Sequence, residues 1–323
     1  MIDPESAFSE VLMRRASGGR VAVALSGGLD SMVLLDVAAK FSITQQSLRL
    51  EAIHVHHGLS QNADGWVAHC QRECEKRGIP LSVVRVAIDR HATDGQGIEA
   101  AARAARYTAF EESGANVILS AQHADDQAET VLHQLLRGTG WAGLAGMGEA
   151  RLLGPGVNLV RPFLQLERAA LEAYASAHQL AWVEDESNKD TAFSRNFLRH
   201  RVMPVIAERF PKYRASLART ARHAAEADRL LEALAKIDLQ WDGKTARAEF
   251  LDGLPEERQT NALYHWLGWM RVPQPSHAQL VEWSRQLFRA PPADRRHQAG
   301  GHDYLIMRKA DCLTLEATRD TAG

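Results

Sequence analysis

The stretch that decides the fold is VAVALSGGLDSMVLLDV, residues 21–37. An apolar run rich in valine leads into paired glycines flanked by serines, and an apolar helical pattern begins at Asp30. Glycines let backbone amides approach an anion closely, and a helix amino terminus adds unpaired N–H groups and partial positive charge. The sequence therefore predicts a phosphate-binding loop. Its members are Ser26, Gly27, Gly28, Leu29, Asp30 and Ser31.

A carboxylate in this loop needs a cation beside it. Polyphosphate would repel Asp30, so we predict that Mg²⁺ bridges this side chain and the phosphates. The Walker pattern with its lysine and the GxGxxG pattern are both missing, which argues against ordinary P-loop and dinucleotide sites. The structural alternative is a glycine turn that only caps a helix through Ser26 or Asp30.

Strand and helix patterns alternate from residue 20 to about residue 140. Strands that are apolar on both faces and separated by helices indicate an α/β fold with a doubly wound parallel sheet. Ligands of such folds bind at the carboxyl ends of the strands. We expect the sheet to end by Gly140 and the glycine-rich segment 141–158 to be a loop. The predicted strands are 21–25, 50–56, 81–88 and 116–121, and the predicted helices are 30–41, 65–78, 99–112 and 126–138.

The chain exceeds the usual size of a single core, so we expect two domains. We place a first domain, which contains the phosphate-binding loop and has a helical extension, at 1–215 and a mainly helical domain at 216–323. In the extension, we predict helices at 164–178 and 191–210. In the second domain, we predict helices at 261–270 and 276–288 and a hairpin at 303–317. Trp266 and Trp269 are three apart; core packing is favoured over a base-stacking platform.

Composition indicates a soluble globular protein, with 45% hydrophobic residues, 24% charged residues and a formal net charge of −2. We find neither an apolar run of about 18 residues nor a signal-peptide pattern, so we expect a cytoplasmic protein with no membrane partner. Cys70, Cys74 and Cys312 are too few and too oddly placed for a disulfide framework or a four-ligand zinc site. We interpret Cys70 and Cys74 as half-buried thiols rather than a redox pair.

Three more motifs accompany SGGLDS: HVHHGL at 54–59, QHADDQAET at 122–130, and WVEDESNKDTAFSRNFLRHR at 182–201. SGGLDS resembles the signature of the PP-loop ATP pyrophosphatases, and the four motifs together resemble the tRNA(Ile)-lysidine synthetase family over about residues 20–215. His56, Ser60 and Gln122 depart from that family, which often has asparagine, arginine and histidine there. Longer members carry another small domain, so we expect a short member or a shortened chain.

The resemblance implies a carbon–nitrogen ligase that uses ATP and Mg²⁺. Its members adenylate the C2 carbonyl of the wobble cytidine of AUA-reading isoleucine tRNA. Free L-lysine then displaces AMP to give lysidine, and pyrophosphate is the other product. The expected partners are therefore tRNA(Ile) with a CAU anticodon and L-lysine, and we add a second copy of the chain in a homodimer.

Two carboxylates suit the ammonium groups of free lysine. Asp126 and Glu129, three apart at a helix start, are predicted to bind lysine and, with Asp30, to be catalytic. Asp125 either helps them or caps the helix, and the general base stays open. His54 is the predicted nucleotide contact among the ATP-binding residues, with His57 as the alternative. A zinc site from His54, His56 and His57 lacks a fourth ligand.

Arginines are the predicted contacts to tRNA, because phosphate binding needs cations. Arg103 and Arg106 lie on the helix predicted at 99–112, and a basic tract follows from residue 195 to residue 222. A solvated helix face is the alternative for this tract. The preferred tRNA-binding residues are Arg106, Arg195, Asn196 and Arg199.

Three rival functions share the loop. A tRNA thiolase also adenylates a base, but thiolases often carry CxxC, which this sequence lacks. A small-molecule synthetase would not need the basic tract. A non-catalytic ATP sensor would leave Asp126 and Glu129 without a purpose.

Overall fold

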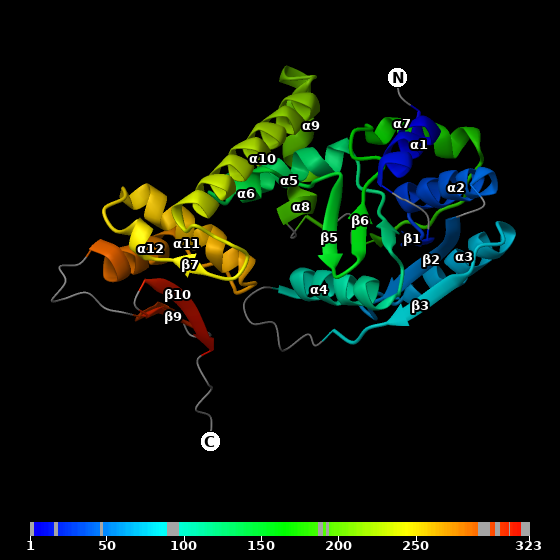
Figure 1. Ribbon diagram of the computed structural model, residues 1–323. Helices are drawn as coiled ribbons and strands as arrows, with labels where there is room; N and C mark the ends of the chain where they lie inside the picture. Colours follow the sequence, from blue (N-terminus) through cyan, green and yellow to red (C-terminus); the bar gives the residue numbers. More distant parts are fainter. Residues whose placement is uncertain are drawn as a thin grey trace. The chain divides into compact units, whose positions relative to one another are not determined.

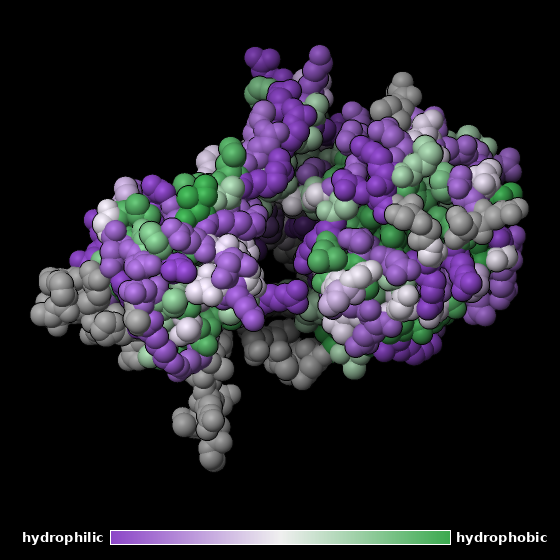
Figure 2. Space-filling view, in the orientation of Figure 1, coloured by the Kyte–Doolittle hydropathy of each residue, from purple (hydrophilic) through white to green (hydrophobic). Residues whose placement is uncertain are grey.

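The computed structural model describes residues 3–15, 19–45, 48–88, 97–186, 190–191, 194–289, 298–300, 304–309 and 311–317. The chain divides into two compact units, residues 1–222 and 223–323, which are described one at a time (Figure 1). Figure 2 shows that hydrophilic residues cover most of the visible surface of each unit. No helix among the described residues is both long enough and apolar enough to cross a membrane.

A six-stranded sheet forms the centre of the first unit, in the order β3-β2-β1-β4-β6-β5. Every neighbouring pair is parallel except β5 and β6, which are antiparallel. The fold is therefore the predicted α/β class with a mostly parallel sheet. The strands are β1 Gly19–Ala24, β2 Leu48–His56, β3 Leu81–Arg85, β4 Val117–Leu119, β5 Ala150–Gly154 and β6 Val157–Val160.

Helices cover both faces of this sheet. Alternate residues of a strand point to opposite faces, so each strand contributes side chains to two cores. Val21 and Val23 of β1 share a core with α1, α2, α3 and α7, whereas Ala22 shares the opposite core with Phe110 of α4. The double winding predicted from strands apolar on both faces is confirmed. These helices and the two that follow β4 are α1 Pro4–Arg15, α2 Leu29–Thr44, α3 Ala63–Lys76, α4 Gly97–Glu112, α5 Ala124–Leu136, α6 Trp141–Leu144 and α7 Arg168–Ala177.

The prediction that the sheet ends by Gly140 is wrong. β5 and β6 form a hairpin joined by Pro155 and Gly156, and β6 pairs with β4 in the main sheet. Gly156 has a φ of +78°, a conformation that glycine adopts at little cost, which explains the tight turn. A Pro-Gly pair between two apolar runs was the signal for this hairpin, and the surrounding glycines obscured it.

A π-helical turn, η2 Leu198–Val202, joins α8 Ser194–Phe197 to α9 Met203–Arg209. Pro204 lies in the first turn of α9, where its missing N–H and its ring oppose a regular helix through the preceding turn. The helix predicted at 191–210 is thus interrupted, and its residues 192 and 193 lie outside the described residues. The long α10, Tyr213–Asp238, contains the division between the two units.

The second unit is mainly helical, as predicted, with an antiparallel sheet in the order β7-β10-β9-β8. The predicted terminal hairpin is β9 and β10; residues 303 and 310 lie outside the described residues. Trp266 is 1% exposed within the core, which confirms core packing for this residue. Trp269 stacks on Trp241 with ring centroids 5.1 Å apart. The elements are β7 Ala246–Arg247, η3 Glu249–Leu251, α11 Glu256–Trp269, α12 His277–Ser284, η4 Arg285–Arg289, β8 Gln298–Gly300, β9 Tyr304–Lys309 and β10 Cys312–Ala317.

Candidate active site

The predicted phosphate loop connects β1 to α2 at the carboxyl edge of the sheet. The Ser31 hydroxyl oxygen accepts a hydrogen bond from the Gly27 backbone N–H at 3.1 Å and donates to the Gly28 carbonyl at 2.9 Å. The Ser26 hydroxyl oxygen lies 3.1 Å from that of Ser31 and accepts from the Gly28 N–H at 3.4 Å. The two serines therefore hold the loop in shape.

Glycine is required at position 27. Its φ is +88°, and a Cβ there would lie 3.1 Å from both the Cys70 Sγ and the Val183 Cγ2. Gly28 is the N-cap of α2, and no side chain caps this helix, so the capping alternative for Ser26 or Asp30 is wrong. The helix amino terminus is left for an anion, which is the arrangement that binds phosphate.

His54, on β2, contacts the residue before this loop, and His57 directly follows β2. The His54 Nδ1 is 2.8 Å from the Leu25 carbonyl oxygen, and burial lowers the pKa of this histidine. His54 therefore supports the loop backbone as a neutral ring. Burial and then the Arg106 guanidinium lower the pKa of His57 to about 4, so His57 is also neutral at pH 7. No group of three or more histidine, cysteine, aspartate or glutamate side chains is arranged to hold a metal ion among the described residues, so the structure does not support zinc at His54, His56 and His57.

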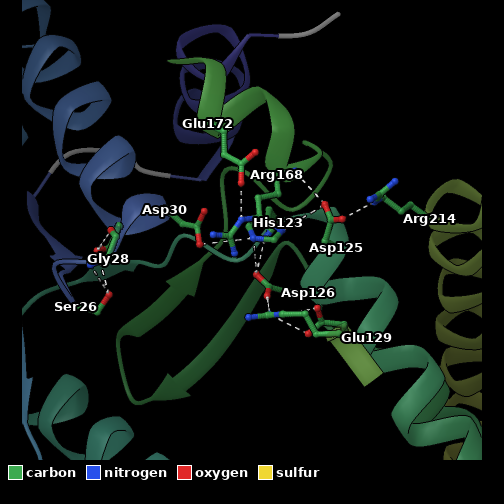
Figure 3. Close-up of polar contacts among 12 residues, drawn as sticks. Ser26, Gly28, Asp30, His123, Asp125, Asp126, Glu129, Arg168, Glu172 and Arg214 are labelled. Atoms are coloured by element: carbon green, nitrogen blue, oxygen red, sulfur yellow. Dashed lines mark hydrogen bonds and ion pairs between the residues drawn. The ribbon is translucent and has the colours of Figure 1, made fainter. Parts of the chain in front are cut away.

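His123, the N-cap of α5, lies at the centre of an acidic cluster (Figure 3). Its Nε2 is 3.7 Å from the Asp30 Oδ2 and 3.4 Å from the Asp126 Oδ2, and its Nδ1 is 3.7 Å from the Asp125 Oδ2. Burial lowers the pKa of His123, but these three carboxylates outweigh it and the net pKa is raised. No role was predicted for His123, although it lies in the 122–130 motif.

Asp30 faces this histidine from the first turn of α2. Burial raises its pKa, but His123 and the more distant Arg168 and Arg199 outweigh that effect, so the net pKa is lowered. Its Oδ1 is buried and has no hydrogen-bond partner among the described residues. An ionised carboxylate with one oxygen uncommitted suits a cation ligand, so Asp30 fits the Mg²⁺ predicted there.

Asp126 and Glu129 converge on one arginine, a contact that their spacing on α5 did not predict. The Arg199 Nε donates to the Glu129 Oε1 at 2.6 Å, and its Nη2 donates to the Glu129 Oε2 and the Asp126 Oδ1, both at 2.8 Å. Burial raises the pKa of Glu129, whose side chain is 7% exposed, although Arg199 opposes this effect. Arg199 reaches both acids from the π-helical turn, which places this residue between the two helices that flank it.

Asp125 is committed elsewhere. Its Oδ2 accepts a hydrogen bond from the Arg168 backbone N–H at 2.9 Å, and its Oδ1 accepts from the Arg214 Nε at 2.5 Å. Asp125 thus caps the start of α7 rather than its own helix and links α5 to α10, as Figure 3 shows. The alternatives of helping Asp126 and Glu129 or capping α5 both missed this contact.

The predicted tRNA contacts do not form one cluster. Arg195 donates to the Thr130 hydroxyl at 3.1 Å, and Asn196 donates to the Asp190 carbonyl at 2.9 Å, so both lie near α5 and the loop before α8. Arg106 is exposed on α4, on the other side of the carboxyl edge. Arg199 is half-buried and hydrogen-bonds to Glu129 and Asp126, so its main contacts are within the protein. The roles assigned to these four residues in tRNA binding stay predictions.

Two family models match the chain. A PP-loop domain model matches residues 4–206, and a model described as the TilS substrate binding domain matches residues 247–314. A tRNA(Ile)-lysidine synthase of Pseudomonas fluorescens is 49% identical over 269 residues, and one of Burkholderia pseudomallei is 48% identical over 282 residues. The chain belongs to the tRNA(Ile)-lysidine synthase family. The family resemblance inferred from the four motifs is therefore confirmed.

The alignments cover more of this chain than of its relatives. They cover 79% and 84% of the chain but 60% and 57% of the two proteins just named, and 89% and 67% for a relative from Salmonella typhi that is 44% identical. The chain thus spans about 60% of the length of the first two. Among solved structures, a U34-tRNA thiolase of Methanococcus maripaludis superimposes with a TM-score of 0.59 at 18% identity. That match covers 69% of this chain and 78% of the thiolase, and it supports the fold alone.

Proposed function

We propose that this chain catalyses lysidine formation. In the first step, the C2 carbonyl oxygen of the wobble cytidine attacks the α-phosphate of ATP and pyrophosphate leaves. In the second step, the amine of free L-lysine attacks C2, a carbon–nitrogen bond forms, AMP leaves with the bonding electrons, and the amine loses a proton. The family membership and the matched PP-loop domain support this proposal.

One observation carries the proposal: the anion-binding loop and the acid pair lie at the same edge of the sheet, connected through His123. The loop holds backbone N–H groups at the start of α2, whereas Asp126 and Glu129 lie at the start of α5, with His123 in contact with both Asp30 and Asp126 (Figure 3). The proposed sites for phosphate and for the lysine ammonium group therefore lie on either side of the buried His123 ring. A ligase that uses ATP and lysine must hold its substrates close together in this way.

The acid pair proposed to bind lysine already has a cation beside it, the Arg199 guanidinium. Arg199 offsets part of the negative charge of Glu129 and Asp126, and its side chain is 30% exposed. We propose that the ε-ammonium of lysine binds the same two carboxylates, sharing them with Arg199 or taking its place. The two carboxylates also lie where the attacking amine can release its proton.

Asp30 is the proposed Mg²⁺ ligand, on the strength of its ionised carboxylate and its uncommitted Oδ1. Bound Mg²⁺ would neutralise charge on the leaving pyrophosphate. His123 keeps Asp30 ionised and in place. The two serines bind the Gly27 and Gly28 N–H groups, so the N–H groups at the start of α2 are the donors proposed to bind the phosphates.

The proposed partner is isoleucine tRNA with a CAU anticodon, whose loop bases can be splayed into a pocket. The match to a substrate-binding domain at 247–314 supports a role for the second unit in holding it. We further propose that the chain acts in the cytoplasm, where ATP, lysine and tRNA are present. The expected homodimer stays a prediction.

Incorporation of labelled lysine into unmodified isoleucine tRNA tests the function. We expect incorporation to need ATP, Mg²⁺ and that tRNA, and to fall at least about 100-fold in Asp126→Asn, because this variant loses a charge that holds lysine. Glu75→Gln, an exposed acid on α3, is the matched control and should behave as wild type. ATP cleavage to AMP with no lysine incorporation by the wild type would mean that the substrate is different.

A further inference from the structure

Three arginines gather around one tyrosine beside the active-site edge. Arg103 and Tyr107 are one turn apart on α4, and the Arg103 Cζ lies 4.9 Å from the centre of the Tyr107 ring. The Arg151 Cζ, from β5, lies 5.4 Å from the same centre. Arg161 directly follows β6, and Arg103, Arg151 and Tyr107 all contribute to its electrostatic environment. Helix, edge strand and inner strand thus bring three positive charges together.

Arg161 is the unusual member of this group. It is 2% exposed, and its partners are neutral: its Nε donates to the Gln122 Oε1 at 3.1 Å, and its Nη1 donates to the Gly148 carbonyl at 2.7 Å. Burial, and then the neighbouring Arg103 and Arg151, lower its pKa. Within the described part of the chain, no carboxylate forms an ion pair with Arg103, Arg151 or Arg161.

A buried guanidinium normally has an anion beside it, because the cost of taking a charge out of water is otherwise not offset. Two half-buried arginines of this unit follow that rule. Arg77 pairs with Asp36 and Glu73, and Arg199 pairs with Asp126 and Glu129. The Arg161 cluster therefore has the charge of a site whose anion comes from another molecule.

Phosphate is the anion that fits, since guanidinium groups bind its oxygens through paired hydrogen bonds. ATP is a poor source because its loop follows β1, with β4 between β1 and β6, and β5 lies beyond β6 at the sheet edge. Arg151 on β5 is exposed, so a polymer can reach the cluster from outside. The Gln122 contact connects the cluster to the residue next to His123.

We propose that Arg103, Arg151 and Arg161, around Tyr107, bind one phosphodiester group of the nucleic-acid strand that carries the reacting base. This inference rests on the proposed function, because it takes tRNA as the substrate. The site anchors the strand on the α4 and β5 side of the edge, opposite the acid pair on α5. Gln122 then transmits the position of the bound strand to the loop that holds His123.

The test measures the dissociation constant of unmodified isoleucine tRNA for the whole chain between about 50 and 300 mM salt. Arg151→Gln is the main variant because Arg151 is exposed and its loss leaves the core intact. Arg49→Gln is the matched control, an exposed arginine on β2 beside Arg20 at the opposite, amino edge of the same sheet. ATP KM is measured for all three proteins.

We expect Arg151→Gln to weaken tRNA binding about fivefold and to reduce the slope of log Kd against log salt by about 0.7, the value for one phosphate contact on a single strand. Arg49→Gln should leave both quantities unchanged, and ATP KM should not move in either variant. Equal effects of the two variants would overturn the proposal. A raised ATP KM with unchanged tRNA affinity would also overturn it, since the phosphate would then be that of ATP.

Wild-type lysine incorporation, measured in parallel, separates this inference from the proposed function. Normal incorporation with an unchanged salt slope in Arg151→Gln would reject the phosphate site and leave the function intact. Wild-type tRNA binding without incorporation, together with a reduced slope in Arg151→Gln, would support the site and reject the reaction.

Discussion

Two groups of arginines flank the carboxyl edge of the sheet, and they differ in how their charge is met. On the α5 side, Arg199 and Arg214 are paired with Glu129, Asp126 and Asp125 at 2.5–2.8 Å. On the α4 side, Arg103, Arg151 and Arg161 form no ion pair with any described carboxylate, and two of them lie against an aromatic ring. The arginines are therefore ion-paired within the protein on the α5 side and lack such pairs among the described residues on the α4 side.

The presence or absence of an ion pair indicates which arginines stabilise the folded protein and which are available to bind a ligand. A paired buried arginine is part of the structure, since its removal strands a carboxylate away from water. An unpaired buried arginine costs the free protein stability, and a binding partner can offset this cost. Stability and affinity measurements should therefore rank the two groups in opposite orders.

Arg199→Met should have the largest effect on stability. It leaves Glu129 and Asp126 close together without their shared cation, so we expect a loss of about 3 kcal/mol in the free energy of unfolding. Urea denaturation followed by circular dichroism measures this change. Adding Glu129→Gln should recover part of the loss. A double variant no more stable than Arg199→Met would show that the unpaired Glu129 carboxylate is not the cause of the loss.

Asp36→Asn removes the charge that pairs with Arg77, an arginine outside the candidate active site. Asp36 accepts hydrogen bonds from Arg77 at 3.0 Å and from the Tyr174 hydroxyl at 3.0 Å. Burial raises its pKa, but these partners outweigh burial and the net pKa is lowered below 3.8. A lowered folded-state pKa stabilises the protein above pH 3.8, and that contribution is lost as pH falls through the folded-state pKa.

We therefore expect Asp36→Asn to cost about 2 kcal/mol at pH 7, and the difference from wild type to shrink below pH 3.8. Unfolding curves between pH 7 and pH 3 measure both quantities. A difference that stays constant down to pH 3 would show that the carboxylate charge is not the cause.

Arg214→Met should cost less, about 1 kcal/mol. Asp125 keeps its hydrogen bond from the Arg168 backbone N–H and stays beside His123, so its charge remains compensated. Thermal unfolding against wild type measures the change. A loss as large as that of Arg199→Met would mean that Arg214 is the main partner of Asp125.

Arg161→Met should have the smallest effect on stability, within about 1 kcal/mol of wild type, because it removes an unpaired buried charge along with two hydrogen bonds to neutral groups. Its tRNA affinity should nevertheless fall. Arg161→Met should therefore affect tRNA affinity more than stability, whereas Arg199→Met should mainly affect stability. If Arg161→Met destabilised the chain as much as Arg199→Met, a protein carboxylate would have to pair with Arg161, and the comparison would fail.

The sequence predicted the fold where the signal was local. The Ser26–Ser31 loop between an apolar strand and an apolar helix could be predicted because glycine chemistry and helix termini act over a few residues. β5 and β6 were missed because a two-residue turn among several glycines resembles an extended loop. β7 and β8, with two and three residues, are too short to show the alternation of apolar and polar residues that marks a strand.

The site was predicted only in part, because charge pairing depends on contacts between distant residues. Spacing placed Asp126 and Glu129 on one face of α5, but Arg199 lies 70 residues after Glu129. Nothing local marked Arg161 as buried, since an arginine after a short strand is ordinarily exposed. His123 was hidden for the same reason, because its three carboxylates come partly from α2 and partly from α5.

A single-turnover experiment on Glu129→Gln tests the central claim most directly, which is that the loop and Asp30 serve ATP while Asp126 and Glu129 serve lysine. Pyrophosphate release and lysine transfer to isoleucine tRNA are followed together over a range of lysine concentrations. We predict that the pyrophosphate burst stays within about threefold of wild type, whereas lysine transfer falls about 100-fold with a raised lysine requirement. Loss of the burst with an unchanged lysine requirement would contradict the account, since Glu129 would then act on ATP.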